Sequence, residues 1–167
     1  MSRKASLLIA GLVALTAATQ AAAQSANGSI QATAFVYRPL AVASGADLQF
    51  GDVFPGVDKT VGVTDAGAGR LDITGQTSAP VSMTFALPAV LSDGGNTLPI
   101  GSWTGHWNTA SAPTGGTDFT PSGASTNAAL SADVIGALYV FIGAQVQPAA
   151  AQAAGSYSGT VSVTVVY

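Results

Sequence analysis

The sequence offers few side chains that can perform acid-base or nucleophilic chemistry. His106 is the only histidine, cysteine is absent, and all eight acidic residues are aspartate. A zinc site takes three or four His, Cys or carboxylate ligands, which a lone histidine without cysteines does not supply. Ser, His and Asp can meet in a folded protein from distant positions, but GHWN around His106 has no nucleophile-elbow pattern. The chain is therefore predicted not to be an enzyme, and His106 is predicted to be a strand residue that faces solvent.

Two further groups of residues have types that suit ligand binding. Asp58, Asp65 and Asp72 recur in a glycine-rich stretch, but that stretch does not match the D-x-D-x-D-G loop of calcium sites. Turn formation is the favoured role of these aspartates, and no metal or other cofactor is predicted. Trp103 and Trp107 fall on one side of an expected strand. They are interpreted as core residues or, alternatively, as a platform on which a sugar ring stacks.

The amino-terminal residues have the pattern of an export signal. Arg3 and Lys4 precede an apolar run over 7–15, and small residues end at Ala23, which is the order of a secretory signal peptide. The run is shorter than the roughly 18 to 20 apolar residues that span a bilayer. We therefore expect a signal peptide over 1–23 and a mature chain over 24–167 without a membrane span. We expect it to pass through the inner membrane and the periplasm to the cell surface or an extracellular fibre.

The composition of the expected mature chain limits the classes of partner that it can bind. Without Arg3 and Lys4, three basic residues remain against eight aspartates, a formal charge of −5. No nucleic acid is expected to bind, because phosphate binding needs a dense basic patch. Charged residues make up 8% of the chain, far below the roughly 25% of ordinary soluble domains. A surface so poor in charge suits a structural or adhesive extracellular protein.

Hydrophobic periodicity predicts short strands and no long helix. The segment 29–37 alternates, 80–88 places apolar residues on one face, and 137–146 is a nearly continuous apolar run typical of a strand buried on both faces. Further strands are expected at 40–44, 47–53, 60–64, 70–75 and 97–109, and a long exposed loop at 110–128. Because turn signals separate these runs, we predict one all-β domain, an Ig-like antiparallel β-sandwich that is either complete or completed by strand donation.

The last residues, GSYSGTVSVTVVY at 155–167, form the most regular alternating segment. Ser and Thr occupy one face of this expected strand. The other face carries Tyr157, Val161, Val163, Val165 and Tyr167. An unpaired apolar edge strand is a place where another chain can add a strand. The segment 24–37 has the form of such a donor, since small apolar side chains alternate along it at Ile30, Ala32, Ala34 and Val36.

Three stretches resemble a family of secreted, pilin-like bacterial domains of unknown function. They are YRPLAV at 37–42, LQFGDVFPG at 48–56, and the C-terminal pattern G-x-Y-x-G-T-x-x-V-T-V-x-Y at 155–167. That family is similar to spore coat protein U and to the subunits of archaic chaperone-usher pili. The resemblance extends over essentially the whole mature chain.

The resemblance implies an incomplete sandwich whose missing strand comes first from a periplasmic chaperone and then from the N-terminal extension of another subunit. It implies that 29–37 is the donor strand, and that the final strand is the edge that a chaperone engages. The implied partners are further copies of the chain or other pilin-like subunits, a chaperone and an outer-membrane usher. We therefore expect a structural subunit of a surface fibre or coat. The alternative is a self-contained adhesion or glycan-binding sandwich, in which 29–37 pairs within its own domain.

Overall fold

The computed structural model describes residues 25–167. The predicted signal peptide, 1–23, lies outside the described residues. Ten strands and no helix occupy the described range, as expected from residues that include a single lysine and no glutamate. None of residues 25–167 belongs to a helix that is long and apolar enough to cross a membrane.

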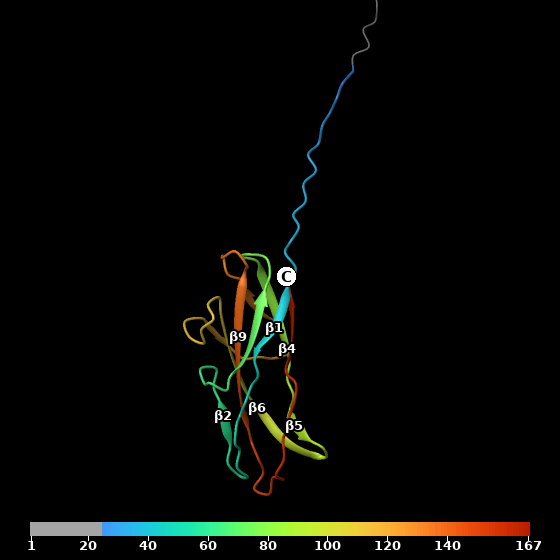
Figure 1. The fold of residues 1–167 in the computed structure, drawn as a ribbon. Helices are drawn as coiled ribbons and strands as arrows, with labels where there is room; N and C mark the ends of the chain where they lie inside the picture. The colour runs from blue at the N-terminus through green and yellow to red at the C-terminus, as the bar shows by residue number, and fades with distance from the viewer. Residues whose placement is uncertain (1–24) are drawn as a thin grey trace, which may run out of the picture. The chain divides into compact units, whose positions relative to one another are not determined.

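The larger sheet contains seven strands (Figure 1). Five of them follow the order β1 (Ala41–Ala46), β3 (Gly69–Thr74), β9 (Ala137–Val146), β6 (Asn96–Asn108) and β5 (Val90–Asp93). β2 (Lys59–Val61) pairs with the end of β9, and β7 (Thr117–Phe119) pairs with the end of β6. Every pair in this sheet is antiparallel.

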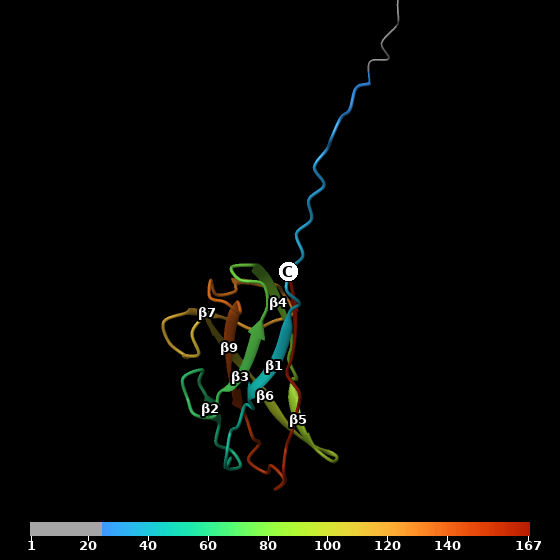
Figure 2. The ribbon, with the colours of Figure 1, turned by 45° about the horizontal axis from the view of Figure 1, so that its top comes forward.

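A second sheet contains β10 (Ser162–Val166), β4 (Pro80–Ala86) and β8 (Thr126–Ala129), with β4 in the middle. Met83 of this sheet and Leu138 and Val140 of the larger one belong to a single buried cluster, so the two sheets enclose one core. The predicted fold class, an Ig-like antiparallel β-sandwich, is confirmed. Figure 2 shows β1, β3 and β9 side by side in the larger sheet.

Two strands carry most of the core, and both were predicted. β9 pairs with β3 on one side and with β6 on the other, and most of its side chains are buried on both faces. Val81, Met83 and Phe85 of β4 alternate as buried residues with Ser82 and Thr84 between them. The continuous apolar run and the two-residue period therefore indicated the right strands, because these strands are the ones most completely covered.

Three segments differ from the sequence-based prediction. Residues 47–53 form no strand, and Gly51 in this segment has a φ of 64°, which interrupts an extended backbone. The supposed loop at 110–128 contains β7 and the start of β8. Residues 25–39 have exposed side chains and no strand assignment, although 29–37 alternates. The alternating pattern at 29–37 therefore does not correspond to a strand within the described chain.

Asp133 organises the turn between β8 and β9. Its Oδ1 accepts hydrogen bonds from Ser131 Oγ at 2.5 Å and from Gly136 N at 3.1 Å. The Ser131 hydroxyl is the main cause of a lowered pKa of the Asp133 carboxyl. Desolvation acts in the opposite direction, and the backbone groups of 135–137 lower the pKa further.

We expect Ser131→Ala to raise the pKa of Asp133 towards its ordinary value. Because the folded-state pKa lies below the unfolded one, the ionised carboxylate stabilises the fold above the unfolded pKa of about 3.9. This contribution is lost as the pH falls through the folded-state pKa. NMR titration of the Asp133 carboxyl carbon measures the change, with Ser156→Ala outside this turn as the control. Identical titration midpoints in wild type and Ser131→Ala would show that the hydroxyl does not set this pKa.

Candidate functional site

β10 is a free edge whose core-facing side chains are incompletely covered. It pairs only with β4, where Val163 lies opposite Phe85 and Val165 opposite Met83. Paired residues of antiparallel strands share a face, so both valines point towards the core. Phe85 and Met83 are 3% and 0% exposed, whereas the two valines are only half-buried. The core is therefore partly exposed to solvent along β10.

β1 is an edge strand of the larger sheet, and its core-facing side is also incompletely covered. Val42 lies opposite Ile73 of β3 and shares its face. Ile73 is completely buried, but Val42 remains 43% exposed. The Tyr167 hydroxyl, just after β10, donates a hydrogen bond to the carbonyl of Arg38, just before β1. β10 thus ends beside the start of β1 (Figures 1 and 2), and the two free edges run in opposite directions.

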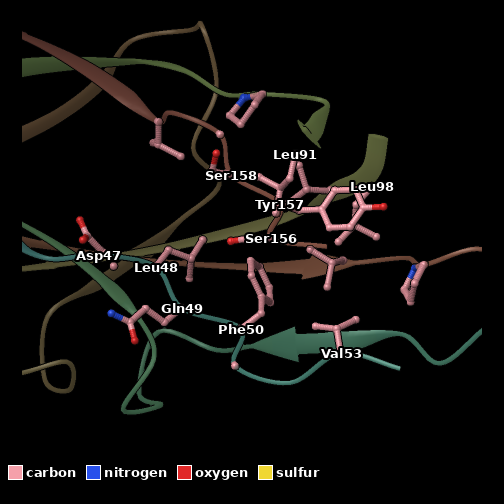
Figure 3. A pocket seen from close by; sticks show the side chains of 18 of the residues that line it. Asp47, Leu48, Gln49, Phe50, Val53, Leu91, Leu98, Ser156, Tyr157 and Ser158 are labelled. Carbon is pink, nitrogen blue, oxygen red and sulfur yellow. The ribbon is translucent and has the colours of Figure 1, made fainter. Parts of the chain in front are cut away.

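A groove of about 1040 Å³ opens between the chain that follows β1 and the chain that precedes β10. Figure 3 shows its close surroundings, with Leu48 and Phe50 on one side and Leu91 and Tyr157 on the other. Side chains of β6, including Trp103, contribute to the floor. Polar and charged residues, among them Asp47, Gln49 and Arg70, line the groove as well. Its apolar and aromatic side chains offer contact area to the apolar side chains of a bound segment.

The chain before β10 is fixed against β5, on the opposite side from β1. Ser92 N donates to Ser158 O at 2.8 Å, and Ser158 N donates to Ser92 O at 3.0 Å. The Tyr157 hydroxyl donates to Ala153 O at 2.8 Å. A Cβ on Gly159 would lie 2.8 Å from Leu91 Cδ2, so Gly159 packs closely against this side chain of β5. This packing and the Ser92–Ser158 hydrogen bonds attach the chain before β10 to β5, whereas β10 has no ladder partner on its β1 side within the described chain.

The predicted edge residues separate into three positions. Val163 and Val165 lie in β10, and Val161 precedes it and lines the groove. Tyr157 forms a groove wall, and Tyr167 lies at the opposite end of β10, half-exposed beside Arg38. The alternation correctly placed the valines on one face. It did not indicate that the strand begins only at 162.

The predicted donor residues are exposed in the described structure. Ile30 is 97% exposed, and Ala32, Ala34 and Val36 are also exposed. No strand contains any of them, so their backbone groups are free of a ladder within the described chain. Their role as donors stays a prediction.

Trp103 and Trp107 both pack against the main core cluster and are partly buried. Trp103 also reaches the groove and the second buried cluster, whereas Trp107 is not among the groove residues. A bulge in the pairing of β6 with β9 falls between Gly101 and Thr104, next to Trp103. The two rings are therefore core-packing residues, and a sugar-stacking role for them stays a prediction.

The prediction that His106 faces solvent is wrong. His106 is buried, and its Nδ1 lies 2.6 Å from Asp118 Oδ1 because β6 and β7 pair at these residues. Its Nε2 accepts a hydrogen bond from Gly116 N at 3.2 Å. A neutral ring with its proton on Nδ1 satisfies both contacts. Both ring nitrogens are thus engaged, and neither is directed at a serine hydroxyl.

Of the three aspartates considered above, Asp65 forms a turn and Asp72 forms an ion pair. Asp65 Oδ2 accepts a hydrogen bond from Gly62 N at 2.8 Å, as expected of a turn residue. Asp72 instead lies in β3, with its Oδ1 2.8 Å from Arg70 Nε. A strand was predicted at 70–75, where residues two apart share a face, but the sequence did not single out this pair. Residues 25–167 contain no group of three or more potential His, Asp or Glu ligands that could hold a metal ion.

The sandwich and its open side define a class of protein: an all-β, two-sheet domain with free edge strands β1 and β10 and a groove between the chain that follows β1 and the chain that precedes β10. The chain belongs to the DUF4402 family, described as a domain of unknown function, whose sequence model matches residues 40–167. This match includes all ten strands and the groove. The comparison with curated proteins gives no match.

Proposed function

We propose that this protein is a structural subunit of a bacterial surface fibre or coat, assembled by strand donation between subunits. The observation that carries the proposal is the pair of free edges. Val42 on β1 and Val163 and Val165 on β10 all face the core, yet all are left partly exposed on strand edges that no other strand of the described chain covers. An extended segment in the gap between these two edges would cover the side chains and bond to both strands.

Residues 29–37 supply a segment with the required form. This segment is longer than either β1 or β10, so at about 3.3 Å per residue it can follow the whole of each free edge. Its small side chains at Ala32 and Ala34 would enter a space bordered by the valines of β10. Ile30 and Val36 would fill wider positions at either end. The main chain would supply ladder bonds, and the side chains would set the register.

Export by a signal peptide over 1–23, a periplasmic chaperone and an outer-membrane usher belong to the same proposal. The sequence resemblance at 37–42, 48–56 and 155–167 supports them. An apolar groove exposed to water promotes aggregation, so a chaperone strand that covers the groove before assembly would keep each subunit soluble.

We expect the mature protein, 24–167, to form linear polymers, and the variant lacking 24–37 to remain a folded monomer. The deleted residues contribute no strand to the body, so strand content measured by circular dichroism should be unchanged. Size-exclusion chromatography with light scattering and negative-stain electron microscopy measure assembly. A mature protein that stays a compact monomer, with or without residues 24–37, would contradict strand donation.

A self-contained glycan-binding module is the second candidate, and the aromatic lining of the groove favours it. Trp103, Phe50 and Tyr157 all border the groove, and aromatic rings present apolar faces on which sugars stack. On this reading, Trp103→Ala abolishes binding on a glycan array, whereas Trp107→Ala, outside the groove, retains it. Equal binding by wild type and Trp103→Ala would exclude the groove as the sugar site.

A further inference from the structure

We propose that a clamp built on Tyr167 keeps the leading segment of each chain out of its own groove, so that the occupant is residues 29–37 of a second copy. The clamp consists of Tyr167, Gln76, Arg38 and the Arg38-Pro39 peptide. This inference rests on the proposed function, and it adds the structural reason why a chain does not fill its own groove.

The clamp ties the chain just before β1 to the end of β10. The Tyr167 hydroxyl donates to Arg38 O and accepts from Gln76 N at 2.8 Å. Arg38 N donates to Gln76 Oε1 at 3.2 Å, and Arg38 Nη1 donates to Val134 O at 3.1 Å. Arg38 is therefore held through its carbonyl, its amide and its side chain.

The position of the Tyr167 hydroxyl depends on close packing. A Cβ on Gly75 would lie 2.6 Å from this oxygen, so only a glycine leaves room for it. The Tyr167 ring also lies 5.2 Å from the Tyr37 ring, between centroids. Tyr167 thus contacts both the residue before Arg38 and Arg38 itself, and it fixes the path by which the chain enters β1.

A chain that filled its own groove would have to reverse direction between Tyr37 and Leu40. Its segment 29–37 would then run back alongside β1 as the other half of a hairpin. Tight hairpin turns need a positive φ at their first central residue, which favours Gly, Asn or Asp. The sequence here is Arg38-Pro39, and Pro39 restricts Arg38 to an extended backbone. Among the described residues, only Ser78 and Ser102 have a positive φ without being glycine.

Self-insertion would therefore break the hydrogen bonds of Arg38 and impose an unfavourable turn. A segment from a second copy meets neither obstacle, because its own Arg38 stays bound in its own body. Ile30 and Val36 are exposed in the described structure, so they are accessible to another chain. The clamp thus favours the intermolecular product without adding any contact to the groove.

The test compares Tyr167→Phe, which removes the hydroxyl and keeps the ring, with wild type. A second variant combines Arg38→Asn with Pro39→Gly, which removes the arginine contacts and permits a tight turn. Tyr139→Phe on β9 is the matched control. Size-exclusion chromatography with light scattering gives the ratio of monomer to polymer over a range of concentrations. Hydrogen exchange of 29–37 reports whether this segment is inserted.

We expect wild type and Tyr139→Phe to polymerise as the concentration rises. Tyr167→Phe should raise the ratio of self-inserted monomer to polymer roughly tenfold, and Arg38→Asn/Pro39→Gly should raise it further. In these monomers 29–37 should be protected at every concentration, because self-insertion is unimolecular.

The contrary outcomes are distinguishable. Polymers of wild type and of both clamp variants, without protected monomer, would overturn the clamp and leave strand donation in place. A wild-type monomer with unprotected 29–37 would overturn strand donation itself. A wild-type monomer with protected 29–37 would overturn both.

Discussion

Replacing Ala32 and Ala34 with aspartate is expected to abolish polymer formation while the body stays folded. In a donated strand these two side chains would face the groove and the half-buried valines of β10. Burying a carboxylate without a partner in an apolar site costs several kcal/mol, more than a short strand can offset. Both alanines are exposed and outside the strands of the body, so its stability should not change. Light scattering and electron microscopy measure the loss of polymer.

Gln31→Asp/Thr33→Asp is the matched control for this prediction. It adds the same two charges to the same segment, but on the face that would point away from the core. This variant should still polymerise. Equal loss of polymer in both variants would show that charge, rather than the buried face, is responsible. Normal polymers from Ala32→Asp/Ala34→Asp would exclude these residues as the inserted face.

Phe85→Ala is expected to give the largest loss of stability in the body. Phe85 lies on β4, and its ring centroid is 5.5 Å from that of Phe119 on β7 in the larger sheet. It is also directly opposite Val163, so it supports β10 from within the core. Removing a buried phenylalanine ring lowers the free energy of unfolding by about 3 to 5 kcal/mol. Urea unfolding, with an unchanged m value, measures this loss.

Phe54→Ala is the control, because Phe54 is 68% exposed. Its effect on the free energy of unfolding should stay within about 0.5 kcal/mol. Both substitutions should be made in the variant lacking 24–37, because assembly there does not raise the apparent free energy of unfolding. A loss of similar size in the two variants would contradict the described core.

The sequence was most informative for the two strands that supply most of the buried core residues. The apolar run at 137–146 and the alternation at 80–86 gave β9 and β4 because burial alone determines their residue types. The sequence patterns did not indicate β5, which pairs with β6 across a turn where Gly94 has a φ of 58°. The fold class followed from these elements and from the shortage of helix formers.

The groove could be predicted only in part. Alternation in 161–166 indicated an edge strand, but the groove depends on the Ser92–Ser158 bridge, which holds the chain of its second wall against β5. The two residues of this bridge are distant in sequence and are of a type that occurs throughout the chain. β7 was missed for a related reason, because its short Thr-Asp-Phe sequence is a strand only through pairing with β6. The buried state of His106 follows from that same pairing.

The most direct test of strand donation is to add a synthetic peptide of residues 24–37 to the body that lacks them, and to follow hydrogen exchange. We predict saturable binding with new protection along β1 and β10, and no change at β8, the other edge of the smaller sheet. A peptide that does not bind, or that leaves exchange at β1 and β10 unchanged, would contradict the proposal that the gap between these strands accepts a donated strand.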